Sequence, residues 1–184
     1  RMPDASAADI IDAILEWAWV RNRRGQYDGL LPQVERAVQI ARELGDKRRL
    51  GLALSWMGNV HMVTGFPSRG FPYLKEAQGL ATEIGDDQVL LLPLFIATWS
   101  LVERDARSGE EKLAEVIEMA RKQDAPDILG HALTYRAMAL ARLGQFDQAN
   151  GLIDEALGMI STISSPVKQA DVHIGASMAY YDMG

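Results

Sequence analysis

The feature that most restricts how this chain can fold is an internal repeat of about 40 residues. Four segments of similar sequence begin 40, 39 and 40 residues apart: Arg36–Leu44, Glu76–Ile84, Glu115–Gln123 and Glu155–Ile163. A turn recurs at the same interval, at Gly25, Gly65 and Gly144, and Asp105 stands at this position in the third unit. A small repeated unit cannot bury its apolar face alone, so neighbouring units are expected to stack.

Each unit is predicted to contain two α-helices. In the fourth unit, apolar residues recur at helical spacing from Ile128 to Ala141 and again from Ala149 to Ile160. Gly144 lies between them, and glycine ends helices readily in the left-handed conformation. No segment sustains the alternation typical of a strand, so no sheet is expected. The predicted helices are Ser6–Arg23, Asp28–Leu44, Lys47–Thr64, Gly70–Ile84, Asp87–Glu103, Gly109–Lys122, Pro126–Leu143, Asp147–Ile163 and Pro166–Met183.

These patterns predict an all-α fold of stacked antiparallel helix pairs, with about nine helices. We expect residues 1–184 to form a single repeat domain of four helix pairs and one unpaired C-terminal helix. The first helix of each pair should line a concave face. Pro93 should bend the fifth helix, because proline removes one backbone hydrogen bond and crowds the preceding turn.

Charge and composition narrow the classes of partner. The net charge of -6 disfavours binding to nucleic acid, whose phosphates an acidic surface repels. The absence of cysteine rules out disulfides and thiolate nucleophiles, and it fits a cytoplasmic location. The longest stretch without charge, Val89 to Val102, has 14 residues, against roughly 20 needed to cross a bilayer, so no membrane partner is expected.

The N-terminal residues indicate a longer parent protein. The chain begins Arg1-Met2-Pro3-Asp4, which lacks the basic and apolar layout of a signal peptide. Methionine is second rather than first. We therefore expect this chain to be a fragment of a larger multidomain protein.

A small residue lies seven positions before each of these four turns and before Gly184, the turn position of a fifth unit: Ala18, Gly58, Thr98, Ala137 and Ser177. With the turn glycine and the alanines of the second helix, this pattern resembles the tetratricopeptide repeat. The matching sets are Met57-Gly58…Gly65…Ala77 and Ala137…Gly144…Ala149…Ala156. The resemblance covers nearly the whole chain and implies a right-handed superhelix that binds proteins without catalysis. A HEAT or armadillo array, whose period is also near 40 residues, is the alternative. Arg136 and Asp105 depart from the tetratricopeptide pattern.

One helix end suggests the kind of parent protein. The run Ala-Arg-Glu-Leu-Gly-Asp, from Ala41 to Asp46, resembles the C-terminal repeat regions of bacterial signalling proteins. These include class III adenylate and guanylate cyclases with an ATPase module, and LuxR-type ATPase transcriptional regulators. The resemblance implies that any cyclase or ATPase activity lies in domains outside this chain.

A search for catalytic and ligand-binding motifs yields none that we expect to be functional. His61, His131 and His173 are far apart in sequence and form no zinc-binding pair. The segment Gly65–Gly70 has glycines at the spacing of a phosphate-binding loop, but it lacks the Lys-Ser/Thr that follows such a loop. We therefore expect no catalytic residue, no metal and no cofactor.

The resemblance implies a binding groove on the concave face. Residues expected there are Trp19, Asn22, Ser55, Asn59, Phe95, Trp99, Thr134, Tyr135, Met138 and Met178. Aromatic anchors with adaptable methionines are common in binding hot spots, although the same side chains could simply fill a narrow groove. Three functions remain open: a scaffold for a peptide or protein, a small-molecule sensor with a pocket near Tyr135 and His131, and a self-association module.

The last predicted helix generates a prediction about assembly. Pro166–Met183 carries Tyr180 and Tyr181 in an apolar set that lacks a partner helix, so we expect either homodimerisation through this helix or fraying of it. Sedimentation should show a dimer that weakens in Tyr180→Glu or Tyr181→Glu. A strict monomer whose last helix is fully protected from hydrogen exchange would contradict both alternatives.

Overall fold

A computed structural model describes residues 6–163 and 165–184. Arg1-Met2, on which the expectation of a longer parent rests, lies outside these residues. The described residues form nine α-helices and one short 3-10 helix, and none of them forms a strand. The elements are α1 (Ala7–Arg23), α2 (Leu30–Leu44), α3 (Lys47–Val63), α4 (Pro67–Ile84), α5 (Asp87–Val102), α6 (Ala106–Lys122), α7 (Pro126–Arg142), α8 (Phe146–Gly158), η1 (Ile160–Thr162) and α9 (Pro166–Met183).

The all-α fold is confirmed, and three predicted helix bounds are wrong by three residues or more. Helix α4 begins at Pro67 rather than Gly70, because proline is tolerated in the first turn of a helix. Helix α6 begins at Ala106 rather than Gly109, because the side chain of Asp105 accepts a hydrogen bond from the backbone N–H of Ser108 and caps the helix there. Helix α8 ends at Gly158, and η1 follows it.

The turns follow the repeat closely. The turn glycines Gly25, Gly65 and Gly144 all have positive φ, which explains their recurrence. Asp105, which takes their place in the third unit, is extended at a φ of -154° and acts as the N-cap of α6. The third turn therefore needs no left-handed residue at this position, and the loop is one residue shorter.

The Gly-Asp dipeptides end one helix and start the next. Gly45 and Gly85 adopt left-handed conformations at the ends of α2 and α4. Asp46 then caps α3, where its carboxylate accepts hydrogen bonds from the backbone N–H and the guanidinium of Arg49. These bonds hold the pKa of Asp46 below its usual value. In the third repeat the left-handed position is occupied by Asp124, one of the residue types that tolerate it best after glycine.

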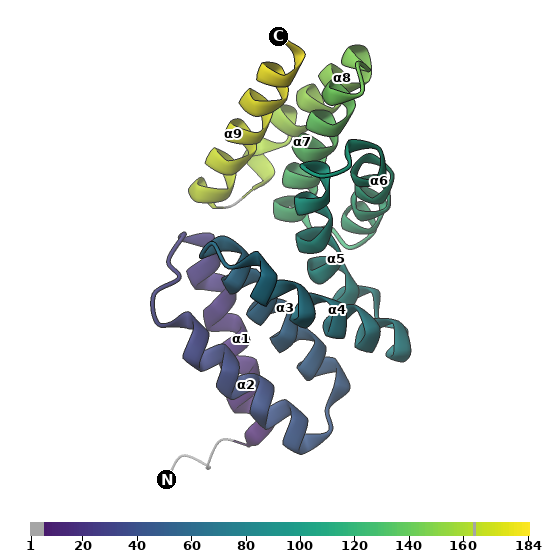
Figure 1. Ribbon diagram of the computed structural model, residues 1–184. Coiled ribbons are helices and arrows are strands. Elements are labelled where there is room, and N and C mark those ends of the chain that lie inside the picture. The colour runs from purple at the N-terminus through teal and green to yellow at the C-terminus, as the bar shows by residue number, and fades with distance from the viewer. Residues whose placement is uncertain (1–5, 164) are drawn as a thin grey trace. The chain divides into compact units, whose positions relative to one another are not determined.

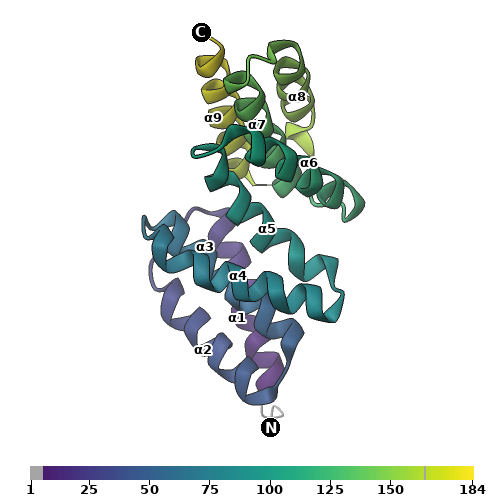
Figure 2. The same ribbon diagram turned by 45° about the vertical axis from the view of Figure 1, so that its right-hand side comes forward.

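The chain divides into two compact units, Arg1–Ile96 and Ala97–Gly184, and the boundary falls within α5. In the first unit, α3 packs against α1, α2 and α4 (Figures 1 and 2). Its core is built from aliphatic and alanine side chains of α1, α2 and α3, together with Trp56 and Met57 of α3 and Ala77 of α4. Pro93 lies inside α5, and its carbonyl accepts a hydrogen bond from the Gln78 side chain. The bend expected at Pro93 stays a prediction.

In the second unit, α7 packs against α6, α8 and α9. Arg136, which departs from the apolar pattern of α7, is accommodated by Glu110 of α6. Its guanidinium donates two hydrogen bonds, of 2.9 and 2.6 Å, to the Glu110 carboxylate. The charged side chain therefore has a partner where the helices meet, as a partly buried charge requires. Within the described residues, no helix has the length and apolarity needed to span a bilayer.

The contact between α3 and α4 depends on glycine. A Cβ atom at Gly58 would collide with the side chain of Leu74, and one at Gly70 would lie 2.9 Å from the carbonyl oxygen of Gly58. The two backbones therefore approach more closely here than any larger residue allows. Gly58 therefore stands at a close contact between the two helices.

We expect Gly58→Leu to lower the free energy of unfolding by about 1–3 kcal/mol or more, because overpacking forces α3 and α4 apart. Gly79→Ala is the matched control. It lies in the same helix pair, a Cβ there meets nothing within 4 Å, and alanine favours a helix by about 1 kcal/mol over glycine. Urea denaturation should show loss of stability in the first variant and none in the second. A neutral Gly58→Leu would contradict the packing.

Candidate functional site

An exposed tryptophan marks the face that α1 shares with α3. Half of the surface of Trp19 (50%) is exposed, and the guanidinium of Arg23 lies 4.4 Å from the centroid of its ring. This cation–π contact holds the indole in place without burying it. A large aromatic side chain that is fixed yet open to solvent is the typical anchor of a protein-binding surface.

Two asparagines lie beside this anchor. Asn22 lies three residues after Trp19 and therefore on the same side of α1. Its Oδ1 atom accepts hydrogen bonds from the Tyr27 hydroxyl (3.1 Å) and from Nδ2 of Asn59 on α3 (3.3 Å). These bonds fix the orientation of both amides. Trp19, Asn22 and Asn59 together form the α1–α3 face.

The outer atoms of this amide pair have no partner. Within the described residues, neither Nδ2 of Asn22 nor Oδ1 of Asn59 forms a hydrogen bond. Neither atom belongs to the unpaired polar atoms that are sealed from solvent. Asn22 is half-buried and Asn59 is 8% exposed, so the pair presents one donor and one acceptor over a small area, both oriented by the bonds behind them.

The other predicted groove residue of α3 offers no surface. Ser55 is fully buried, and its hydroxyl donates a 2.7 Å hydrogen bond to the carbonyl of Gly51 one turn earlier. This hydrogen bond satisfies the hydroxyl, which is the only polar group of the Ser55 side chain. Phe95, on α5, is half-buried.

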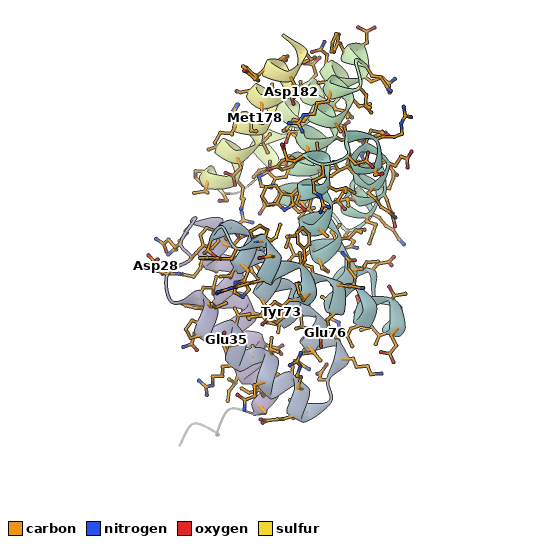
Figure 3. The ribbon with its side chains drawn as sticks, viewed as in Figure 1. Asp28, Glu35, Tyr73, Glu76, Met178 and Asp182 are labelled. Carbon is orange, nitrogen blue, oxygen red and sulfur yellow. The ribbon has the colours of Figure 1, made fainter. Side chains whose placement is uncertain are left out.

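In the second unit the predicted residues differ in exposure. Thr134 and Met138 are fully buried, and Gly175 lets α9 lie close against Thr134. Trp99 and Tyr135 are half-buried, and their ring centroids are 5.5 Å apart. Met178 lies exposed on α9, where Figure 3 labels it together with Asp182. These five residues therefore form no continuous open surface within the unit.

The polar cluster beside Tyr135 is internally paired. Nε2 of His131 and Nζ of Lys168 lie 3.5 and 3.4 Å from Oδ2 of Asp171. Burial alone would raise the pKa of Asp171, but the bond from His131 and the charge of Lys168 outweigh it and lower the pKa. Burial also raises the pKa of Tyr135 to about 12, and the negative charges of Asp171 and Glu103 add to the effect.

A shallow depression of about 520 Å³, missed in the sequence, lies beside α9. Ile174, Met178 and Tyr181 form its apolar part, and 86% of Tyr181 is exposed. Arg142 forms its charged part and bonds Glu103 at 3.0 Å and Asp182 at 2.8 Å. Tyr180, the other predicted self-association residue, is also exposed. The spacing of apolar residues on α9 was enough to predict that Tyr180 and Tyr181 are exposed. The ion pairs of Arg142 could not be predicted in this way, because its partners Glu103 and Asp182 lie 39 and 40 residues away in the sequence.

Among the described residues, no group of three or more histidine, aspartate or glutamate side chains could hold a metal ion. Neither a family model nor a curated protein matches this chain. The fold therefore identifies only a structural class: the chain is an all-α, repeat-like protein of sequentially packed helix pairs.

The raised pKa of Tyr135 predicts a dependence of stability on pH. The folded state holds the phenol proton up to about pH 12, whereas an unfolded tyrosine loses it near 10.0. The folded state therefore binds more protons above pH 10, and the free energy of unfolding must fall as pH rises there. The slope is at most about 1.4 kcal/mol per pH unit.

We expect Tyr135→Phe to make this fall less steep, because the variant has no phenol to ionise. Urea denaturation between about pH 9 and 11.5 measures it. Tyr181→Phe is the control, since that side chain is exposed and its loss should leave the slope unchanged. Equal slopes in wild type and Tyr135→Phe would show that Tyr135 ionises normally.

Proposed function

We propose that this chain is a non-catalytic scaffold of tetratricopeptide type that binds an extended peptide segment of a partner protein on its α1–α3 face. The observation that carries the proposal is the oriented amide pair of Asn22 and Asn59 beside the exposed Trp19. The 40-residue recurrence, the turn glycines and the small residues at helix contacts support the same class.

The amide pair matches the chemistry of a peptide backbone. Each peptide group presents one N–H donor and one C=O acceptor. Oδ1 of Asn59 can accept from the N–H, and Nδ2 of Asn22 can donate to the C=O. Such recognition is independent of the partner's side chains, so it suits an extended segment whose sequence is read elsewhere.

Trp19 supplies the side-chain contact. Its exposed ring offers a flat apolar surface for an aliphatic or aromatic residue of the peptide. The cation–π contact with Arg23 restricts rotation of the ring. Tryptophan is among the residues that contribute most to binding when they lie at the centre of an interface. The scaffold thus combines a general backbone contact with one selective anchor.

The resemblance of Ala41–Asp46 to repeat regions of cyclases and LuxR-type regulators supports a place in a bacterial signalling protein. In that setting the chain acts in the cytoplasm as a regulatory binding module. Any catalytic activity then resides in other domains of the parent.

Self-association is the second candidate, because α9 exposes Ile174, Met178 and Tyr181 around the 520 Å³ depression. An apolar patch of this kind favours association with another surface. A sensor for a small molecule has less support, since His131, Lys168 and Asp171 already contact one another.

The test begins with peptides selected against the wild-type protein from a random library. For the tightest peptide, we expect Asn22→Asp to weaken binding about ten-fold, which corresponds to ~1.4 kcal/mol. The change replaces the outward donor by an acceptor and leaves the bonds from Tyr27 and Asn59 in place. Trp19→Ala should weaken binding by at least as much.

Asn150→Asp is the matched control, because Asn150 is exposed on α8 in the other unit and the change adds the same charge. It should leave the dissociation constant unchanged in a titration followed by calorimetry. Selected peptides that bind Asn22→Asp and Trp19→Ala as tightly as wild type would refute the site.

A further inference from the structure

The loop between α1 and α2 contains the only aspartate–glycine pair in the sequence, Asp28–Gly29. Both residues are exposed, and Figure 3 labels Asp28 on this loop. A Cβ atom at Gly29 would meet nothing within 4 Å, so open space surrounds the glycine. In such a pair the backbone nitrogen of the glycine can attack the side-chain carboxyl group before it, because glycine has no side chain to block the approach.

Residues 27–30 form a tight turn. The N–H of Leu30 donates a 3.1 Å hydrogen bond to the carbonyl of Tyr27. Gly29, the third residue of the turn, has a φ of 70° and a ψ of 2°, whereas the φ of Asp28 is not positive. This combination is a type II turn, whose third position favours glycine. The peptide group between Asp28 and Gly29 therefore faces away from the hydrogen bond that closes the turn.

The N–H of Gly29, which carries the attacking nitrogen, is not engaged elsewhere. Among the described residues it donates no hydrogen bond. The asparagine–glycine pair of the sequence, Asn150–Gly151, differs in this respect. It lies inside α8, where the N–H of Gly151 bonds a carbonyl one turn earlier. A helical nitrogen cannot turn toward a neighbouring side chain without breaking the helix, whereas the nitrogen of Gly29 can.

One contact opposes the reaction at Asp28. A type II turn has a ψ of about +120° at its second residue, which turns the Gly29 nitrogen away from the Asp28 side chain. Rotation of the peptide group between them brings the two together, and glycine tolerates this rotation because it adopts φ of either sign. The carbonyl of Asp28 belongs to that peptide group, and Nη2 of Arg21 donates a 2.8 Å hydrogen bond to it. Arg21 therefore holds the peptide group in its unreactive orientation.

We propose that Asp28 is a site of spontaneous isoaspartate formation and that Arg21 restrains the reaction. The nitrogen of Gly29 attacks Cγ of Asp28, and a C–N bond forms. The nitrogen loses its proton and the carboxyl group loses hydroxide, so water leaves and a cyclic succinimide remains. Water then opens the ring at the former backbone carbonyl, and the main chain afterwards runs through Cβ and Cγ. The sum is an isomerisation that needs no oxidant, reductant or other reactant.

The product changes the loop in two ways. The main chain gains one carbon atom between Asp28 and Gly29, which distorts the turn. The former carbonyl of Asp28 becomes a carboxylate, so Arg21 then faces a negative charge. Both changes lie beside Tyr27, whose hydroxyl orients Asn22 in the α1–α3 face. An effect on peptide binding rests on the proposed function, whereas the isomerisation itself does not.

The test follows the folded protein during a prolonged incubation. Trypsin cleavage after Arg24 and Arg36 releases the segment 25–36, in which Asp28 is the only aspartate or asparagine. An isoaspartate methyltransferase then transfers a labelled methyl group from S-adenosylmethionine to the new carboxylate. We expect label to accumulate in this peptide with incubation time, while mass spectrometry before methylation shows no change in its mass.

Two variants of Asp28 bracket the reaction. Asp28→Glu should abolish the labelling, because its longer side chain would have to close a larger and less favourable ring. Asp28→Asn should react faster, because an amide carries no negative charge to repel the nucleophile. Its product gains the mass that separates asparagine from aspartate.

Two arginine variants test the restraint. Arg21→Gln should raise the rate of isoaspartate formation about ten-fold, which is the effect of losing one hydrogen bond from a charged group. Arg24→Gln is the matched control, since Arg24 is exposed at the end of the same helix and does not bond the Asp28 carbonyl. It should leave the rate unchanged.

Two results would overturn the proposal. The first is that neither wild type nor Arg21→Gln takes up more label at this site than Asp28→Glu, in an incubation continued well past complete deamidation of Asp28→Asn. The second is an equal rate in wild type and Arg21→Gln, which would remove the restraint assigned to Arg21.

Discussion

The contact at Gly58 and Gly70 sets the distance between α3 and α4, and the packing of the first unit depends on it. With glycine on both sides, the backbones approach until a Cβ atom at Gly70 would lie only 2.9 Å from the carbonyl oxygen of Gly58. Alanine plays the same part elsewhere, at Ala18, Ala77 and Ala137, all fully buried. Small residues at these positions let long helices lie close together and bury their aliphatic neighbours.

Close packing of this kind also decides which surfaces remain for binding. A helix pair buries one side against the pair before it and another against the pair after it. In the first unit, the side of α1 that carries Trp19 and Asn22 keeps surface exposed, and in the second unit the depression beside α9 does. The first presents amide groups and an aromatic ring, and the second presents apolar side chains beside Arg142 and its two acidic partners.

Much of the fold could be predicted from the sequence, and less of the candidate site. The helix bounds were close, because glycine turns and aspartate caps act within a few residues of where they stand. The predicted groove included Trp19, Asn22 and Asn59, which the structure brings together in the first unit. It also included Ser55, Thr134 and Met138, which are fully buried, and Asn59 itself is only 8% exposed. Helical spacing identifies a face of a helix, but it does not show how closely the next helix covers that face.

Three alanines separate what the sequence determined from what the tertiary structure decided. Ala13, Ala53 and Ala132 occupy one position of the repeat, and the sequence alone assigns all three to the first helix of a pair. Ala53 and Ala132 are fully buried, whereas Ala13 is exposed. Helix formation depends on residues within a turn or two, so the sequence determines it directly. Burial depends on a helix supplied from elsewhere, so only the packing of α2 on α3 and of α6 on α7 decides it.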